Sequence, residues 1–339
     1  MLRPQLWVVA VALVFGGCGG SSPSPTPTST TGSAGGGTAG GSGGGGGTKS
    51  GGGSSWLVGG SGTLLSSDSA DGTFIARTGP TSADLYALVC VGDLDGWSVG
   101  ANGAIIGTHD GGATWTLESS GVTTSLRALS FADAQHGLAV GDAGTVLRTV
   151  DGGASWSLVG VGTSVALRGV SVSATQAWIV GDGGTLLHSV DGGATFGAAT
   201  SIAAVDLHAI HFSADHSLGA AVGDGGTMVV THDGISWQAL AQAAPGNLAA
   251  LAISNDGQRI VAVGDAGLVW RSTDGAASFT RVIGNDSRQL LTVGFSDDVA
   301  GLGWAAGKTG ALMVTHDDGA TFVAADSGTT QDLFSVDDL

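Results

Sequence analysis

The chain has few charged residues, and most of them are acidic. Charged side chains make up 12% of its 339 positions, and the formal net charge is −17 at pH 7. A surface of this sign offers no basic stripe for nucleic-acid phosphates and disfavours binding to anionic membranes. We therefore expect no nucleic-acid partner.

Cysteine is scarce as well, because Cys18 and Cys90 are the only two. Cys18 follows Arg3 and the apolar stretch 6–15, which has the length of a signal-peptide core and is too short to cross a bilayer as a helix. The small residues directly before Cys18 resemble the lipobox of bacterial lipoproteins. We predict that residues 1–18 are a lipoprotein signal peptide and that Cys18 is lipidated. Cleavage by the ordinary signal peptidase is the alternative.

Lipidation would make a lipid anchor the only membrane contact and place the protein in the cell envelope. Gly19 and Gly20 stand where lipoproteins of an inner membrane carry an aspartate, so the outer membrane or the cell surface is the expected location. Cys90 then has no cysteine with which to form an intrachain disulfide. We expect it to be a small buried residue.

Residues 19–55 are mainly glycine, serine and threonine with a few prolines. Such a segment cannot bury enough apolar surface to offset its chain entropy, so we predict a disordered tether. It would hold a folded domain away from the membrane and leave that domain free to reorient.

Glycine is abundant, with 63 copies, and after position 55 its spacing is regular. A V-G-x-x-G step recurs about every 41 residues, which indicates repeated supersecondary units that bury their apolar faces against one another. The first glycines of the seven steps are Gly59, Gly100, Gly141, Gly181, Gly223, Gly264 and Gly307.

Each unit has the pattern of four short strands. In the third unit we expect them at 126–131, 137–140, 145–149 and 155–159, with turn residues between them. Four-stranded sheets arranged radially form a β-propeller, so we predict an all-β, seven-bladed propeller over residues 56–339. The fourth strand of each unit is expected to hold one aromatic residue. The seven aromatic residues are Phe74, Trp115, Trp156, Phe196, Trp237, Phe279 and Phe322.

The two ends of the repeat array indicate how the ring closes. The first unit begins at Trp56, already in its second strand, whereas the segment 331–336 has the pattern of a first strand. We predict that this C-terminal strand completes the first blade and that the protein is a monomer. An open solenoid would instead need polar caps.

A Ser/Thr-x-Asp-Gly-Gly-x-Thr/Ser-Trp/Phe motif recurs between the third and fourth strands, as in 108–115 and 149–156. It is the Asp-box, or BNR motif, of sialidase-type propellers. Together with V-G-x-x-G, the repeat resembles the photosystem II stability/assembly-factor-like propellers. The motif aspartates are expected to accept hydrogen bonds from turn amides. We also expect turn roles for a second acidic set, Asp142, Asp182, Asp224 and Asp265.

One position near the start of the first strand varies in chemistry while its neighbours do not. It is occupied by Tyr86, Arg127, Arg168 and His208 in four consecutive units, and then by Ala249, Leu291 and Phe334. We predict that the first four form a ligand- or partner-binding site for an acidic group at the axial mouth of the propeller. The alternative is that Arg127 and Arg168 pair with Asp142 and Asp182.

The resemblance leaves two functions open, because fold and activity are separable. The first is a non-enzymatic, surface-tethered propeller that acts as a binding or assembly scaffold for a protein or glycan. The alternative is a glycoside hydrolase of sialidase-like or related Asp-box type. Sialidases use an arginine triad and a tyrosine with a glutamate, whereas this chain has one tyrosine, Tyr86, and one glutamate, Glu118. We therefore predict no catalytic residue, no cofactor and no metal site.

Overall fold

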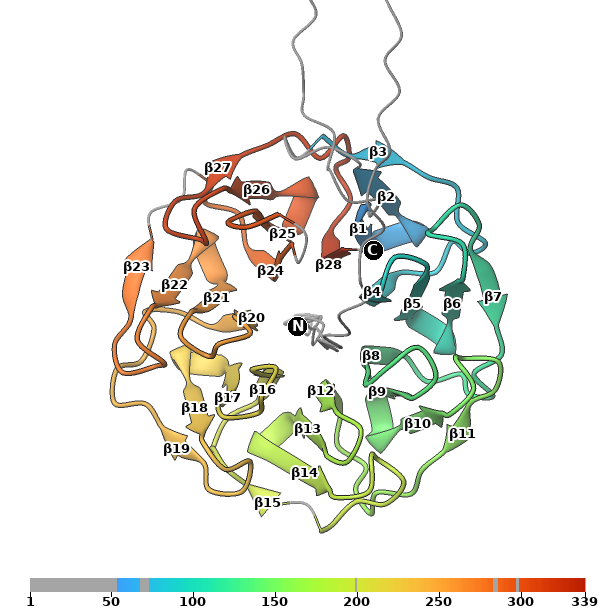
Figure 1. Cartoon of the computed structure of the whole chain (residues 1–339), viewed down its shortest axis with the longest axis horizontal. Coiled ribbons are helices and arrows are strands. Elements are labelled where there is room, and N and C mark those ends of the chain that lie inside the picture. Colours follow the sequence, from blue (N-terminus) through green and yellow to red (C-terminus); the bar gives the residue numbers. More distant parts are fainter. Residues whose placement is uncertain (1–53, 68–72, 199, 283–285, 297–298, 339) are drawn as a thin grey trace, which may run out of the picture.

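The computed structural model describes residues 54–67, 73–198, 200–282, 286–296 and 299–338. Within these ranges the chain forms seven four-stranded antiparallel sheets, arranged as blades around one axis (Figure 1). The predicted all-β, seven-bladed propeller is therefore confirmed. Cys18, the predicted signal peptide and the tether up to residue 53 lie outside the described residues. No helix in the described part of the chain is long and apolar enough to cross a membrane.

The innermost strand of each blade begins with the repeat leucine and runs beside the axis (Figure 1). Its residues are largely buried, because both of its faces pack against neighbouring blades. The seven innermost strands are β28 (Leu333–Asp338), β4 (Leu85–Val91), β8 (Leu126–Phe131), β12 (Leu167–Val172), β16 (Leu207–Phe212), β20 (Leu248–Ile253) and β24 (Leu290–Phe295).

The second and third strands form the middle of each blade, and almost all of their residues are buried. Strands that are apolar on both faces must be covered on both sides, which a ring of stacked blades provides. The second strands are β1 (Ser55–Gly59), β5 (Asp95–Gly100), β9 (Gly137–Gly141), β13 (Ala177–Gly181), β17 (Gly219–Gly223), β21 (Ile260–Gly264) and β25 (Gly303–Gly307). The third strands are β2 (Leu64–Ser67), β6 (Ile105–Thr108), β10 (Val146–Thr149), β14 (Thr185–Ser189), β18 (Met228–Thr231), β22 (Val269–Ser272) and β26 (Leu312–Thr315).

The outermost strands are shorter than predicted. The aromatic residue expected inside each of them lies before it, as Trp156 does before β11, so that detail of the prediction is wrong. The Asp-box turn extends up to the aromatic residue, which packs against the innermost strand of its own blade: the rings of Trp156 and Phe131, the last residue of β8, meet edge to face at 6.0 Å. The outermost strands are β3 (Ile75–Ala76), β7 (Thr116–Glu118), β11 (Ser157–Leu158), β15 (Thr200–Ser201), β19 (Gln238–Ala239), β23 (Thr280–Val282) and β27 (Val323–Ala324).

A single 3-10 turn joins the second and third strands and accounts for both repeat glycines. In the third blade, a Cβ on Gly141 would lie 2.1 Å from the Ser125 carbonyl oxygen, and Gly144 has a φ of 69°. Only glycine tolerates such a backbone approach, and it adopts positive φ readily. The seven turns are η1 (Gly60–Gly62), η2 (Ala101–Gly103), η3 (Asp142–Gly144), η4 (Asp182–Gly184), η5 (Asp224–Gly226), η6 (Asp265–Gly267) and η7 (Lys308–Gly310).

The Asp-box aspartates stabilise their own turns, as expected. Asp151 Oδ1 accepts hydrogen bonds from the Ser155 amide (2.9 Å) and the Thr149 hydroxyl (2.8 Å), and Oδ2 accepts the Ser155 hydroxyl (2.6 Å). Asp110, Asp191, Asp274 and Asp317 make the same three bonds. The motif is thus a local device of the fold.

Two tryptophans tie an Asp-box turn to the preceding blade. Trp97 Nε1 donates to the Gly152 carbonyl at 3.1 Å, and Trp178 Nε1 donates to the Gly234 carbonyl at 2.8 Å. Trp97 also stacks on Phe131 with a centroid separation of 3.9 Å. These indoles therefore fasten adjacent blades through both a polar and an apolar contact.

Strand β28 closes the ring by pairing with β1, which confirms the predicted closure. The Ser55 hydroxyl donates to Asp338 Oδ1 at 2.7 Å within this blade. The Asp337 side chain reaches the second blade, where its Oδ2 accepts a hydrogen bond from the Cys90 amide at 2.8 Å. The Cys90 side chain is buried, as expected.

Removing residues 330–339 should destabilise the propeller strongly, because β1 would lose its inner partner and expose an unpaired edge. We expect the thermal midpoint, measured by circular dichroism, to fall by at least about 10 °C. Deleting residues 36–45, an equally long piece of the glycine-rich segment, should leave the midpoint unchanged. A truncated chain that melts within about 2 °C of the intact one would contradict closure by β28.

Asp191→Ala should lower the thermal midpoint by about 2–4 °C, and Asp191→Asn by less, because asparagine keeps one acceptor oxygen. Hydrogen bonds from Thr195 and Ser189 lower the pKa of Asp191 from 3.8 to about 2. The stabilisation is therefore complete above pH 4 or so and is lost as the pH falls through about 2. The midpoint difference between wild type and Asp191→Ala should shrink over that range in melts at successive pH values. A constant difference would contradict the role of the ionised carboxylate.

Candidate functional site

Each innermost strand has a β-bulge directly after its opening leucine. In the third blade, Leu126 pairs with Gly141 and Ala128 with Val140, so Arg127 stands outside the ladder. A bulge redirects the side chain of the extra residue. The same shift occurs in every blade, and the seven bulged residues are Tyr86, Arg127, Arg168, His208, Ala249, Leu291 and Phe334.

The bulged residues are the variable positions that the sequence singled out, and they lie at one end of the propeller. Each innermost strand contacts the 3-10 turn of the preceding blade. Each turn also hydrogen-bonds its own blade just before the bulge, as the Asp142 amide does with the Ser125 carbonyl at 3.0 Å. We call this end, made of the seven bulged residues and η1–η7, the bulge face.

Arg127 is held by a two-pronged ion pair. Its Nε donates to Asp142 Oδ1 at 2.9 Å, and its Nη2 donates to Asp142 Oδ2 at 2.7 Å. The guanidinium carbon lies 4.8 Å from the ring centroid of Tyr86 in the second blade. Nη1 is buried, and the described residues provide it with no hydrogen-bond acceptor.

Arg127 therefore stays charged with one donor group unused. Burial opposes the charge, but the hydrogen bonds to Asp142 outweigh it and raise the pKa of Arg127. Burial also raises the pKa of Tyr86, so its hydroxyl keeps its proton at neutral pH. The pair thus presents hydrogen-bond donors next to an aromatic face.

Arg168 and His208 lie in the next two blades. Together with Tyr86 and Arg127 they form an arc of polar side chains over four consecutive blades. Arg168 Nε donates to Asp182 Oδ1, and His208 Nε2 lies 2.8 Å from Asp224 Oδ1. Burial lowers the pKa of His208 despite the opposing effect of Asp224, which favours a neutral imidazole at pH 7. The alternative expected from the sequence, that Arg127 and Arg168 pair with Asp142 and Asp182, is confirmed.

The remaining bulged residues make the other half of the bulge face apolar. Ala249, Leu291 and Phe334 form one buried cluster with Tyr86. The rings of Tyr86 and Phe334 meet edge to face with centroids 5.4 Å apart. Tyr86 thus lies where the polar and apolar halves join.

The acidic residues of the 3-10 turns do not act as turn caps, so that prediction is wrong. Their carboxylates bind other side chains: Asp142, Asp182 and Asp224 bind the bulged residues, and Asp265 accepts from Gln289 Nε2 at 2.9 Å. The bulge brings a cation or amide within reach, and a turn amide competes poorly with such a partner. Four of the seven turns, η1, η4, η5 and η7, are capped by a side chain from the next blade instead.

Tyr86 and Glu118, the pair relevant to a sialidase, lie at opposite edges of the second blade. Tyr86 is in the innermost strand β4 and Glu118 in the outermost strand β7. Glu118 Oε2 accepts from Trp156 Nε1 at 3.1 Å, and burial raises its pKa. Among the described residues, no group of three or more His, Cys, Asp and Glu side chains is placed to hold a metal ion.

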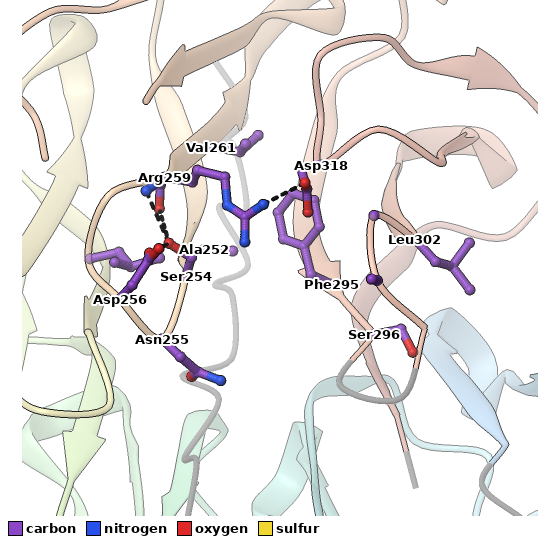
Figure 2. Close-up of a pocket in the computed structure, with 13 residues that line it drawn as sticks. Ala252, Ser254, Asn255, Asp256, Arg259, Val261, Phe295, Ser296, Leu302 and Asp318 are labelled. Atoms are coloured by element: carbon purple, nitrogen blue, oxygen red, sulfur yellow. Dashed lines mark hydrogen bonds and ion pairs between the residues drawn. The ribbon is translucent and has the colours of Figure 1, made fainter. Parts of the chain in front are cut away.

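A pocket of about 360 Å³ lies between the sixth and seventh blades on the face opposite the bulges (Figure 2). Residues 252–256, at the end of β20 and in the loop after it, and residues 300–302 line it, and Arg259 pairs with Asp318 across it (Figure 2). No repeated motif marks these lining residues, so the pocket could not be predicted from the sequence. Since Asp318 already pairs with the guanidinium of Arg259, the positive charge of the pocket is neutralised within it.

One similar solved structure is described as "YCF48 bound to D1 peptide"; it is 18% identical with a TM-score of 0.62, and the match covers 78% of this chain and 88% of that one. Another is YCF48 from Cyanidioschyzon merolae, which is 20% identical with a TM-score of 0.60, and the match covers 75% of this chain and 88% of that one. At these identities they show a shared fold. No curated protein matches the chain. A family model described as photosynthesis system II assembly factor YCF48 matches residues 118–298, more than half of the sequence. Together with the Asp-boxes and the seven-bladed ring, this match shows that the chain belongs to the YCF48 family.

Proposed function

We propose that this propeller is a non-enzymatic scaffold that binds an acidic group of a protein partner on its bulge face. The observation that carries the proposal is Arg127, a fixed cation whose Nη1 is buried without an acceptor in the described structure. A guanidinium already ordered by Asp142 and Tyr86 loses little freedom when it binds a carboxylate.

The rest of the bulge face suits a protein partner. Arg168 and His208 extend the polar half over two more blades, and the buried cluster of Phe334, Leu291 and Ala249 packs beside Tyr86 and supports it from the other side. The net charge of −17 would repel an acidic partner at long range. Recognition would therefore depend on short-range contacts with this arc.

The comparisons support a protein rather than a glycan as the partner. The family is one of assembly factors, and one solved relative with the same fold is described as bound to a D1 peptide. The separation of Tyr86 from Glu118 argues against sialidase-like hydrolysis, since those two groups would have to act on one sugar.

We further propose that the propeller works in the cell envelope, anchored by a lipid on Cys18 and held away from the membrane by residues 19–55. This part of the proposal is supported by the sequence: the apolar stretch 6–15, the small residues before Cys18 and the glycine-rich composition that follows.

Replacing both Arg127 and Arg168 by alanine should weaken partner binding at least about tenfold, because each charged hydrogen bond contributes roughly 1.5–3 kcal/mol. The measurement is capture from envelope extract, with bound proteins quantified by mass spectrometry. The matched control is Arg148→Ala with Arg271→Ala. It removes the same charge from third strands, where these residues donate to the Gly192 and Asp318 carbonyls. If the Arg127/Arg168 variant retains the same proteins as the control, the binding surface lies elsewhere.

Cys18→Ser should release the protein from membranes, because acylation of Cys18 is the proposed anchor. The measurement is fractionation of cells followed by a high-salt wash of the membranes. Cys90→Ser is the control and should remain with the membrane fraction. A Cys18→Ser protein that stays membrane-bound after the wash would contradict the lipid anchor.

A further inference from the structure

Four of the seven turns on the bulge face are capped by the next blade. In each, the amide of the second turn residue donates to a side-chain oxygen of the residue that precedes the next innermost strand. The pairs are Ser61 with Asp84 (2.7 Å), Gly183 with Asp206 (2.8 Å), Gly225 with Asn247 (2.7 Å) and Thr309 with Asp332 (2.9 Å). The propeller therefore shows, four times, how an aspartate or asparagine side chain binds this turn.

The turn of the second blade has no such cap. Ser125 stands at the position of Asp84, and within the described residues the Asn102 amide has no hydrogen-bond acceptor. Asn102 is exposed, with a φ of 58° like the corresponding residues of the other turns. The turn thus has the geometry of its capped counterparts and lacks only the acceptor.

This uncapped turn lies beside the unused donor of Arg127. Strand β8, which carries Arg127, contacts η2, and Ala101 of that turn packs against the cluster that includes Tyr86. The Arg127 guanidinium lies over the Tyr86 ring, so it crosses the boundary between the second and third blades, which we call their seam. Two donors without acceptors, one of them cationic, therefore lie at one seam.

A groove runs past this turn. It has a volume of about 830 Å³ and is lined by residues 81–83, 101–104 and 117–123. Many of these residues carry hydroxyl groups, and Leu117 exposes 61% of its surface there. An extended peptide could lie in such a groove with its backbone satisfied by hydroxyls and one side chain against Leu117.

We propose that an extended acidic peptide of the partner binds in this groove, with one aspartate carboxylate in place of the missing cap. The carboxylate accepts a hydrogen bond from the Asn102 amide, as Asp84 and Asp206 accept from the turns that they cap. Aspartate is favoured because three of the four occupied turns hold an aspartate from the chain's own extended segments. The inference rests on the proposed function and specifies its ligand.

Substitutions at Ser125 test this site, because they can install the missing cap within the chain. Ser125→Asp and Ser125→Asn should both occupy the Asn102 amide, as Asp206 and Asn247 occupy theirs. The asparagine variant adds no charge, so it separates occupation of the amide from repulsion of the peptide. Ser125→Ala is the matched control, and thermal midpoints verify that all three variants fold.

The probe is a peptide with the sequence of residues 80–86, Pro-Thr-Ser-Ala-Asp-Leu-Tyr, acetylated and amidated at its ends, added to the full chain. We expect a saturable NMR shift of the Asn102 amide in wild type and in Ser125→Ala, at least about tenfold weaker binding in the other two variants, and no shift with alanine in place of the peptide's aspartate. An unmoved Asn102 amide at millimolar peptide, or equal binding to all variants, would overturn the site.

The capture experiment then separates this inference from the proposed function. If Ser125→Asp keeps the envelope partner while the Arg127/Arg168 variant loses it, the arginine arc binds the partner and the turn site is wrong. If both variants keep the partner, both proposals are wrong. If both lose it, both are supported.

Discussion

The close approach of two backbones at the first glycine of each turn is the constraint on which this propeller depends. A Cβ on Gly100 would lie 1.9 Å from the Asp84 carbonyl oxygen, and the other first glycines are equally confined. Each turn is thereby pressed against the entry of its innermost strand, which accommodates the contact by bulging. The bulge places one side chain per blade at the axial end of the ring. The candidate site is thus a direct product of the glycine repeat.

The sequence predicted what is local and periodic. The seven units, the Asp-box turns and the closing strand follow from residues that recur in register, such as the leucine before each bulge. The contacts between blades could not be predicted, because they join residues that no short pattern relates. The cap from Asp206 to Gly183 and the pair of Trp156 with Glu118 are of this kind. The bulge at Arg127 was also missed, because a register shift changes pairing without changing the pattern of side chains.

The two faces of the ring differ in chemistry for physical reasons. On the Asp-box face, exposed carboxylates such as Asp191 and Asp274 have pKa values near 2, because turn hydroxyls and amides stabilise the ionised form. That face carries fixed negative charge. On the bulge face the carboxylates of Asp142 and Asp182 are paired with arginines, and the aromatic rings of Tyr86 and Phe334 lie buried beside them. The two faces therefore differ in how far their carboxylates are neutralised by cations.

The pairing of β28 with β1 also determines when the protein can become stable during its synthesis. The first blade is begun by residues near position 55 and finished by residues 333–338, so six blades leave the ribosome before the first is whole. Until then its second strand has an open edge, and the neighbouring blades lack one wall. The ring can therefore close only after the six other blades have been synthesised, and β28 then supplies the inner edge of the first blade and the missing wall of its neighbours.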